Sequence, residues 1–166
     1  LGVPILTSWQ AKDMIDNEHP MYFGSPGIYG QRTANKVLHH ADMIVAIGNR
    51  MSIWHCGYDG PRPDQQVLMV DVDGHEVEKF KQAQWINQDA REFISNLSGN
   101  PRCENWLAWC AMHRVTWVEA AHADANDYIN SYRFVEALHP FLAPDEVIVT
   151  DMGTAHICAH QVLKLK

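Results

Sequence analysis

Several hallmarks of common protein classes are missing from this sequence of 166 residues. It has no run of about 18 apolar residues, so a membrane-spanning helix is not predicted. The GxSxG and GxGxxG motifs are absent, and so is the Ser/His/Asp order of a hydrolase triad. Its four cysteines form no CxxC pair, which argues against a metal or redox motif of that kind. Candidate sites must therefore be sought at the ends of strands and helices.

Charge and cysteine usage narrow the class of protein further. A formal net charge of -7 at pH 7 argues against partners such as nucleic acids or acidic membrane surfaces. The scattered thiols of Cys56, Cys103, Cys110 and Cys158 are expected to be reduced, which favours a cytoplasmic location. The sequence has no signal peptide, begins without methionine and ends abruptly. These features predict a soluble domain that is part of a longer chain.

The clearest pattern that is present lies in residues 41–50, ADMIVAIGNR. Five apolar residues at 43–47 run unbroken up to a glycine, which predicts a strand buried on both faces of a parallel sheet. Residues 31–40 predict a helix, because apolar side chains recur there at helical spacing. A second apolar run, residues 67–70, ends in an acidic segment, DVD. The recurrence predicts a doubly wound parallel α/β sheet, a Rossmann-like fold whose ligands bind beyond the carboxyl ends of the strands.

Shorter elements complete the first half of the chain. We expect strands at residues 3–7 and around 85–86, a short helix at 74–80 and irregular structure at 52–66. Residues 89–97 predict a helix with Asp89 as its N-cap. Residues 21–30 contain three glycines ahead of the helix at 31–40, an arrangement that offers backbone N–H groups to an anion. Ordinary turns also use glycine, so both interpretations stay open.

The pattern changes after residue 98. Residues 100–117 predict a capped helix whose stripe of tryptophan, cysteine and histidine is expected to be packing surface. Residues 119–127 are polar and rich in alanine, which predicts a linker. A helix at 129–142, a strand at 146–150 and a helix at 154–163 are expected next. This order predicts the incomplete start of a second α/β domain.

Three loops at strand ends are candidate ligand sites. Gly48-Asn49-Arg50 pairs a glycine that admits a ligand with an arginine that binds phosphate or stacks on a base, or it is a tight turn with a solvated arginine. Asp71 is placed to accept hydrogen bonds from ribose hydroxyls, while Asp73 serves as a helix N-cap. Residues 151–154, DMGT, form either a phosphate or cofactor site at a helix N-terminus or an ordinary capped turn.

Neither a metal ligand nor a catalytic residue is assigned from the sequence. His156 and His160 are four residues apart on the predicted last helix, but HxxxH lacks the glutamate of HExxH and no third ligand is evident. Histidines of the core or the surface explain this pair better.

Four stretches, in this order, resemble one family: the thiamine diphosphate enzymes of the acetolactate synthase type. Residues 4–35, PILTSWQAKDMIDNEHPMYFGSPGIYGQRTAN, are similar to the family's segment that contains a glycine-rich turn. Residues 37–52, VLHHADMIVAIGNRMS, resemble its strand followed by GxR. Residues 67–80, VLMVDVDGHEVEKF, resemble its "vDiD" segment, and residues 151–153, DMG, resemble the D-x-G at the start of its C-terminal domain.

The resemblance implies a domain organisation and a set of cofactors. Residues 1–98 correspond to most of a central, nucleotide- or FAD-binding-like domain, 99–130 to a helix and linker, and 131–166 to the start of the diphosphate-binding domain. Members of the family have three α/β domains, form homodimers or homotetramers, and use thiamine diphosphate with Mg²⁺; their central domain holds FAD, ADP or nothing. The implied FAD contacts are Tyr29, Gly30, Gly48, Asn49, Arg50, Asp71 and Val72. The implied thiamine diphosphate contacts are Met152, Gly153, Thr154 and Ala155.

The sequence also departs from the family. It lacks the N-terminal domain that supplies the activating glutamate, and it lacks the GDG…N motif that binds Mg²⁺ and the diphosphate. Residues 50–53, RMSI, differ from the RFDD of the anabolic acetolactate synthases. We therefore expect part of an acetolactate synthase-like carboligase or decarboxylase acting on 2-oxo acids, inactive by itself. The alternative is a non-catalytic FAD- or ADP-binding domain, or a structural domain.

Overall fold

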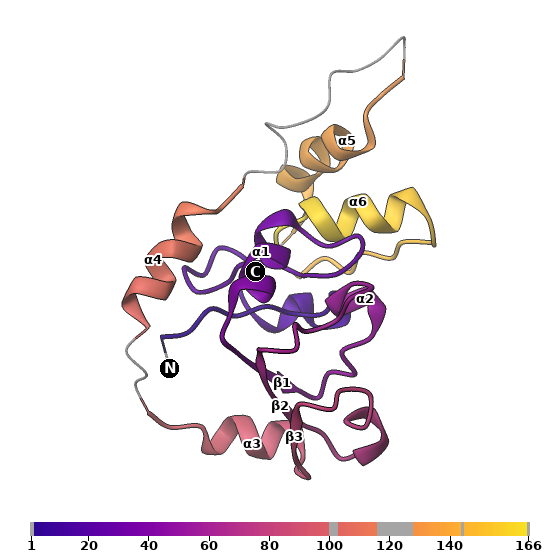
Figure 1. Ribbon diagram of the computed structural model, residues 1–166. Coiled ribbons are helices and arrows are strands. Elements are labelled where there is room, and N and C mark those ends of the chain that lie inside the picture. The colour runs from indigo at the N-terminus through magenta and orange to yellow at the C-terminus, as the bar shows by residue number, and fades with distance from the viewer. Residues whose placement is uncertain (1, 100–102, 116–127, 144, 166) are drawn as a thin grey trace.

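A parallel three-stranded sheet forms the centre of the first half of the chain (Figure 1). The computed structural model describes residues 2–99, 103–115, 128–143 and 145–165. The strands β1 (Met43–Ile47), β2 (Gln66–Val70) and β3 (Ala83–Ile86) lie in the order β1-β2-β3. In the register, Ile47 pairs with Val70 and Val70 with Ile86. The three strands therefore end at one edge of the sheet, as the α/β prediction requires.

The described ranges contain α-helices and short 3₁₀ helices besides this sheet. The α-helices are α1 (Arg32–His40), α2 (Ile53–Cys56), α3 (Ala90–Asn96), α4 (Glu104–Met112), α5 (Ser131–Leu138) and α6 (Thr154–Val162). Short 3₁₀ helices are η1 (Trp9–Met14), η2 (Gly74–Glu76) and η4 (His139–Phe141). As predicted, Asp89 caps α3, where its Oδ1 accepts the N–H groups of Arg91 and Glu92 at 2.9 and 3.1 Å. None of the helices in these ranges is long and apolar enough to cross a membrane.

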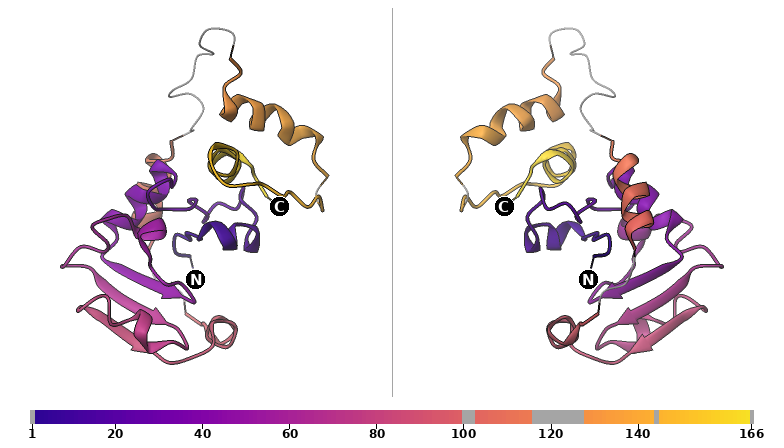
Figure 2. Two further views of the ribbon diagram at one scale, coloured as in Figure 1. Left: turned by 90° about the vertical axis from the view of Figure 1, so that its right-hand side faces the viewer. Right: turned by 90° about the vertical axis from the view of Figure 1, so that its left-hand side faces the viewer.

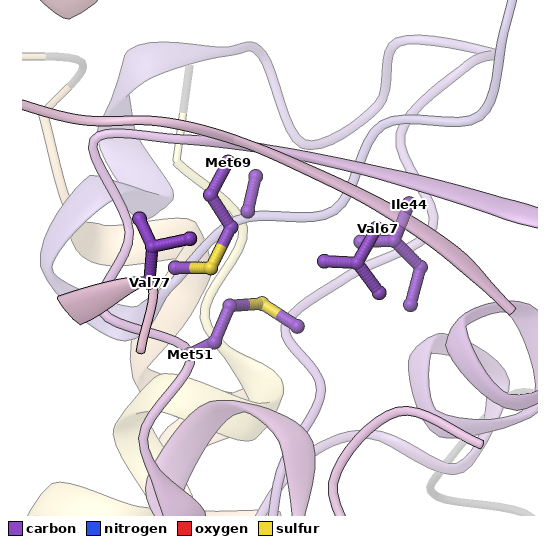
Figure 3. Close-up of a cluster of buried hydrophobic side chains, with 6 residues drawn as sticks. Ile44, Met51, Val67, Met69 and Val77 are labelled. Atoms are coloured by element: carbon purple, nitrogen blue, oxygen red, sulfur yellow. The ribbon is translucent and has the colours of Figure 1, made fainter. Parts of the chain in front are cut away.

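One face of the sheet carries the main core (Figure 3). Its buried side chains come from both long strands and from the loops that follow them, and they are Ile44, Ala46, Met51, Val67, Met69 and Val77. Leu38 of α1 packs against this cluster, while Val37 of the same stripe packs with Phe23 and Cys110, so the predicted stripe covers the sheet only in part.

The opposite face of β1 is half exposed, so the prediction of a strand buried on both faces is wrong. Met43 and Val45 are 50% and 45% exposed, whereas Ile44 and Ala46 are buried. The alternation arises because successive side chains of a strand point to opposite faces, and within the described residues only one face is fully covered. An unbroken apolar run does not by itself show that both faces are buried.

Four other predicted segments also differ from the structure. Residues 3–7 make only an isolated parallel bridge, between Ile5 and Tyr22, instead of a strand. Residues 52–66 include α2, and residues 74–80 form a helix only at Gly74–Glu76. Residues 146–150 form no strand in the described part of the chain, and Val147 and Val149 are 83% and 88% exposed. A strand needs backbone partners for its hydrogen bonds, and in the described ranges residues 147–150 have no such partner.

Helix α4 packs through its aromatic stripe, as predicted for the described part of that stripe. The rings of Trp106 and Trp109 stack at 4.9 Å, and Trp109 and His113 stack at 3.9 Å. Cys110 of the same helix is fully buried in a cluster with Phe23 and Val37. The predicted N-cap at residue 100, residue 117 of the stripe and the linker at 119–127 lie outside the described residues.

Helices α5 and α6 form a separate small core. Val135, Cys158, Ala159 and Leu163 are its buried members. Both views of Figure 2 show the indigo N-terminal segment between the sheet and the yellow α6. Hydrogen bonds join this segment to the end of the chain, including one from the backbone N–H of Asn17 to the carbonyl of Leu165 at 2.9 Å.

Candidate cofactor-binding site

The loops after β1 and β2 meet at the carboxyl edge of the sheet. The amide of Gly48 donates to the Val70 carbonyl at 2.8 Å, so the residue after β1 lies beside the last residue of β2. Gly48 has φ of 57°, a conformation that favours glycine. The structure therefore brings the predicted residues 48–50 together with Asp71 and Val72, on neighbouring strands of one edge. That amide is already used within the protein, so a ligand would meet the side chains of this loop.

Arg50 is the main positive group of this edge. Its side chain is 71% exposed, and its Nε donates to Glu76 Oε1 at 2.9 Å. Lys79 also forms an ion pair with Glu76. The hydrogen bond from Lys79, followed by the charge of Arg50, lowers the pKa of Glu76 below its usual range. Arg50 is thus an exposed cation that is shared with Glu76, and it is the group of this edge that could pair with a phosphate.

Asp73 is the helix cap that the sequence predicts, and Asp71 lies beside it. Asp73 Oδ1 accepts the N–H of His75 at 3.0 Å and so caps η2. Asp71 Oδ1 accepts the N–H of Asp73 at 3.0 Å, while its other carboxylate oxygen accepts no hydrogen bond from the described ranges. Val72 is 68% exposed. Asp71 therefore keeps a carboxylate oxygen that could accept a hydrogen bond from a ribose hydroxyl.

The glycine-rich segment, residues 24–30, packs against α2, the short helix that follows the Arg50 loop. Gly27 has φ of 120°, and a Cβ there would fall 1.7 Å from the Trp54 carbonyl oxygen, so only glycine permits this contact. Tyr29 is 42% exposed and stacks on Trp54 with ring centroids 5.9 Å apart. Tyr29 and Gly30 are thus held next to the helix that follows the Arg50 loop.

The amides of this segment do not form the open anion cradle that the glycines suggested. Ser25 donates to Gln31 Oε1 at 2.9 Å, Gly27 to Asn35 Oδ1 at 2.7 Å, and Gly30 to the Gly27 carbonyl at 2.9 Å. The glycines serve the tight turn itself. Turn geometry, the alternative interpretation of these glycines, is therefore correct for these three amides.

The N-terminus of α6 has the opposite character, because it is open. Gly153, with φ of 99°, is the N-cap residue and no side chain caps the helix. Residues 151–155 are exposed, and a Cβ on Gly153 would meet no atom within 4 Å. In the part of the chain that is described, the N–H groups of Thr154, Ala155 and His156 have no acceptor. Free amides and the helix dipole together fit a diphosphate.

A cluster of aromatic rings connects this helix to the glycine-rich segment. Trp9 stacks on His160 at 5.3 Å, meets His156 edge-on at 5.2 Å and lies 6.4 Å from Tyr29. Lys12 is 3% exposed, and burial lowers its pKa to about 8. Burial, followed by the charges of His156 and Lys12, lowers the pKa of His160 to about 4. The predicted contacts at 152–155 are therefore tied to the region of Tyr29 through α6.

Several residues of this arrangement carry no signal in the sequence. Trp9 and Lys12 belong to a polar stretch with no periodicity, and Gln31 and Gln161 are 130 residues apart. Trp54 stands in a segment predicted to be irregular. Only the fold shows that these residues meet. Among the described residues, no group of three or more His, Cys, Asp or Glu side chains is placed to hold a metal ion.

Comparisons with known proteins identify the family to which the chain is similar. Residues 1–97 match the model of a protein family described as thiamine pyrophosphate enzyme, central domain. The chain is 24% identical over 170 residues to the acetolactate synthase large subunit of Corynebacterium glutamicum, covering 96% of the chain and 27% of that protein. It is 24% identical over 169 residues to acetolactate synthase isozyme 1 large subunit of Escherichia coli, covering 98% and 30%.

A relative with a different name is nearly as similar. Pyruvate oxidase of Lactiplantibacillus plantarum is 22% identical over 172 residues, which cover 99% of the chain and 28% of that protein. The chain thus spans less than a third of the length of each of these three relatives. The matches support the family more strongly than any one reaction within it.

Proposed function

Because the chain belongs to the thiamine pyrophosphate enzymes, whose central-domain model matches residues 1–97, we propose that it is part of an enzyme that uses thiamine diphosphate to act on 2-oxo acids. The proposed reaction is of the acetolactate synthase type, either a carboligation or a decarboxylation. The observation that carries the proposal is the open N-terminus of α6, which follows the DMG segment with free amides and no side-chain cap. That site is suited to the diphosphate of this cofactor.

The proposed division of the chain follows the resemblance. Residues 1–98 would be the central domain, 99–130 a helix and linker, and 131–166 the start of the diphosphate-binding domain. One observation supports this division: the cluster on the sheet and the cluster of α5 and α6 share no residue. We further propose that the full protein is a cytoplasmic homodimer or homotetramer.

The residues of α6 have defined roles in the proposal. Thr154 and Ala155 would donate their backbone N–H groups to the diphosphate, and Gly153 would admit it close to the backbone. Met152, which is 84% exposed, would contact the rest of the cofactor. When bound, thiamine diphosphate supplies a nucleophilic carbon for cleaving or joining C–C bonds next to a carbonyl. Mg²⁺ would accompany the diphosphate, and none of the described residues is assigned as its ligand.

The carboxyl edge of the sheet is proposed to hold FAD or ADP. Arg50 would pair with a phosphate and Asp71 with a ribose hydroxyl. Tyr29, Gly30, Gly48, Asn49 and Val72 would form the rest of the surface. Glu76 competes for Arg50, so an incoming phosphate must displace this carboxylate or share the cation with it. This competition distinguishes the edge from a site with a free arginine.

A substitution at the first residue of α6 tests the cofactor assignment. Proline is tolerated at the first position of a helix but has no N–H, so Thr154→Pro removes one proposed donor and leaves the helix intact. We expect affinity for thiamine diphosphate with Mg²⁺, measured by isothermal titration calorimetry, to fall about tenfold, as for the loss of one hydrogen bond to a charged group. Thr154→Ala keeps the amide and should bind like the unaltered chain. Equal affinities of all three proteins would contradict the proposal.

The alternative function is a non-catalytic nucleotide-binding or structural domain. It is favoured by the match of residues 1–97 to a central domain alone. Binding of thiamine diphosphate with Mg²⁺ separates these two functions, since only the proposed enzyme part should bind it. No binding of FAD, ADP or NAD would weaken the nucleotide-binding alternative. We expect the 166-residue chain by itself to produce no acetolactate from pyruvate, thiamine diphosphate and Mg²⁺. Steady production would show that the catalytic groups are present within it.

A further inference from the structure

Two glutamines join α6 to the glycine-rich segment in a reciprocal way. Gln31 Nε2 donates to the carbonyl of Gln161 at 2.8 Å. Gln161 Nε2 donates in turn to the carbonyl of Tyr29 at 2.5 Å. Gln161 is only 6% exposed, so these bonds are shielded from water. We call Gln31 and Gln161 together the glutamine clasp.

Gln31 is fixed from the other side by the glycine-rich segment itself. Its Oε1 accepts the N–H of Ser25 at 2.9 Å, so one amide group holds both the turn and the helix. Gly24, with φ of 101°, makes room for this side chain, because a Cβ there would lie 1.9 Å from Gln31 Oε1. Gln31 is thus held in one conformation before it reaches α6.

The clasp binds the C-terminal end of α6, where backbone carbonyls lack acceptor bonds within the helix. The last carbonyls of a helix accept no hydrogen bond within it, and here they accept side-chain hydrogen bonds from another part of the chain. Besides the bond from Gln31, Lys12 Nζ donates to the His160 carbonyl at 2.5 Å. The C-terminal turn of α6 is therefore anchored on residues 12–31 by directional bonds.

Because a helix is rigid, anchoring its C-terminal end also sets the position of its N-terminal end. Helix α6 has nine residues and is about 13 Å long at 1.5 Å per residue. Its C-terminal turn is anchored by the clasp, and its first turn presents the open amides of Thr154 and Ala155. Within the described residues, no side chain caps that first turn.

We propose that Gln31 and Gln161 are positioning residues that set where the diphosphate-binding turn of α6 lies relative to the glycine-rich segment. This inference rests on the proposed function, since it takes the first turn of α6 as the diphosphate site. Neither glutamine touches the cofactor; each acts through the placement of the helix. Loosening the clasp should therefore weaken binding of thiamine diphosphate without changing any of its proposed contacts.

Gln31→Glu tests the clasp with a nearly isosteric change. The new carboxylate keeps an oxygen for the N–H of Ser25 but places a second oxygen against the Gln161 carbonyl, where the donor was. We expect the amides of α6 to exchange about tenfold faster at pH 7, followed by hydrogen exchange with mass spectrometry. Affinity for thiamine diphosphate with Mg²⁺ should fall by a similar factor in calorimetry. Gln84→Glu, the same change at an exposed position of β3, is the matched control.

Lowering the pH should restore the clasp in the variant. Once protonated, the carboxyl introduced by Gln31→Glu can donate its O–H to the Gln161 carbonyl, so the difference from the unaltered chain should shrink from about pH 7 to about pH 4.5. Lys12, His156 and His160 also lie in this region and are the same in both proteins. Comparison at each pH therefore isolates position 31, and a merely structural defect would show no such recovery.

The outcomes separate the clasp from the function on which it rests. Exchange of α6 that is unchanged in Gln31→Glu, or equally fast in Gln84→Glu, would overturn the clasp. Faster exchange with unchanged cofactor affinity would overturn its positioning role. If the unaltered chain binds no thiamine diphosphate while Gln31→Glu still loosens α6 with recovery at low pH, the cofactor assignment fails and the anchoring of α6 stands.

Discussion

The sheet and the α5–α6 pair begin from similar sequence patterns and reach different structures. Residues 67–70 and residues 147–149 are both short apolar runs that lead toward an acidic residue. The first run becomes a central strand with neighbours on both sides. The second stays without strand pairing in the described ranges, and its valines are more than four-fifths exposed. Apolar patterning makes a strand only where neighbouring backbone completes its hydrogen bonds.

The largest expected effect is a difference in the loss of stability between a substitution in the buried strand and one in the exposed run at 147–149. Met69 is fully buried in the sheet core, so Met69→Ala should lower the free energy of unfolding by about 2–5 kcal/mol. Val149 is 88% exposed, and Val149→Ala should change it by less than about 0.5 kcal/mol. Urea unfolding followed by circular dichroism measures both. Similar losses in the two variants would show that residues 147–149 are buried in solution.

Alanine substitutions at Gly27 and Gly153, which both have positive φ, compare how tightly the backbone is packed in the two regions. Gly27→Ala places a Cβ 1.7 Å from the Trp54 carbonyl oxygen and should cost about 2 kcal/mol or more. Gly153→Ala meets no atom within 4 Å, so it should cost only the strain of its φ, about 1 kcal/mol. Thermal unfolding of the two variants gives the difference. A larger loss for Gly153→Ala would mean that the start of α6 is enclosed.

Removing the N-cap of one helix in each region should give smaller losses of stability, of about the same size in both. Asp89 caps α3 beside the sheet, and Asn130 caps α5, where its Oδ1 accepts from Tyr132 at 2.9 Å. Replacing either with alanine should cost about 1 kcal/mol. Hydrogen exchange of each helix, with Ser98→Ala as a control outside both, shows whether the loss stays local. Loss of protection in both helices from one change would indicate that the two regions unfold together.

A pH dependence confined to α6 is the smallest expected effect, because the His160 ring is partly exposed and its charge is screened. Burial lowers the pKa of His160 to about 4, so between pH 6.5 and 4 the unfolded chain binds more protons. Protection of α6 should therefore fall as the pH drops through this window, while β2 is unaffected. The lowered pKa of Lys12, about 8, predicts that protection of α6 rises as the pH is raised from 8 to 10.5.

Hydrogen exchange of the two regions at a series of pH values checks both predictions. His160→Gln should remove the loss on the acidic side, and Lys12→Met should remove the gain on the basic side. A loss of protection at low pH that persists in His160→Gln would assign it to another group, of which His156 is the nearest.

Local sequence patterns predicted the parts of the site that local structure determines. The run at 43–47 and the acidic segment after residue 70 predicted the edge that joins Gly48 to Asp71, since parallel strands end together. The side chain of Asp89 was placed correctly because a cap depends on two or three adjacent residues.

What the sequence could not show depends on distant partners. The glutamine clasp joins positions 130 residues apart, and neither glutamine has a distinctive neighbourhood in the sequence. The exposure of Met43 and the missing strand at residues 146–150 depend on which backbone lies alongside. The glycines at 24–30 were seen, but whether their amides are free or used depends on Gln31 and Asn35.

Two of the buried clusters, one beneath α4 and one between α5 and α6, each contain a buried thiol. Cys110 lies in the cluster with Phe23 and Val37, where burial raises its pKa to about 11, and Cys158 lies between α5 and α6, where burial also raises its pKa. A protonated, enclosed sulfur reacts slowly with alkylating reagents. Its rate of modification therefore reports how often its own surroundings open. The chain thus contains a natural label for each of these two clusters, and peptide mapping after brief alkylation would time the two openings independently.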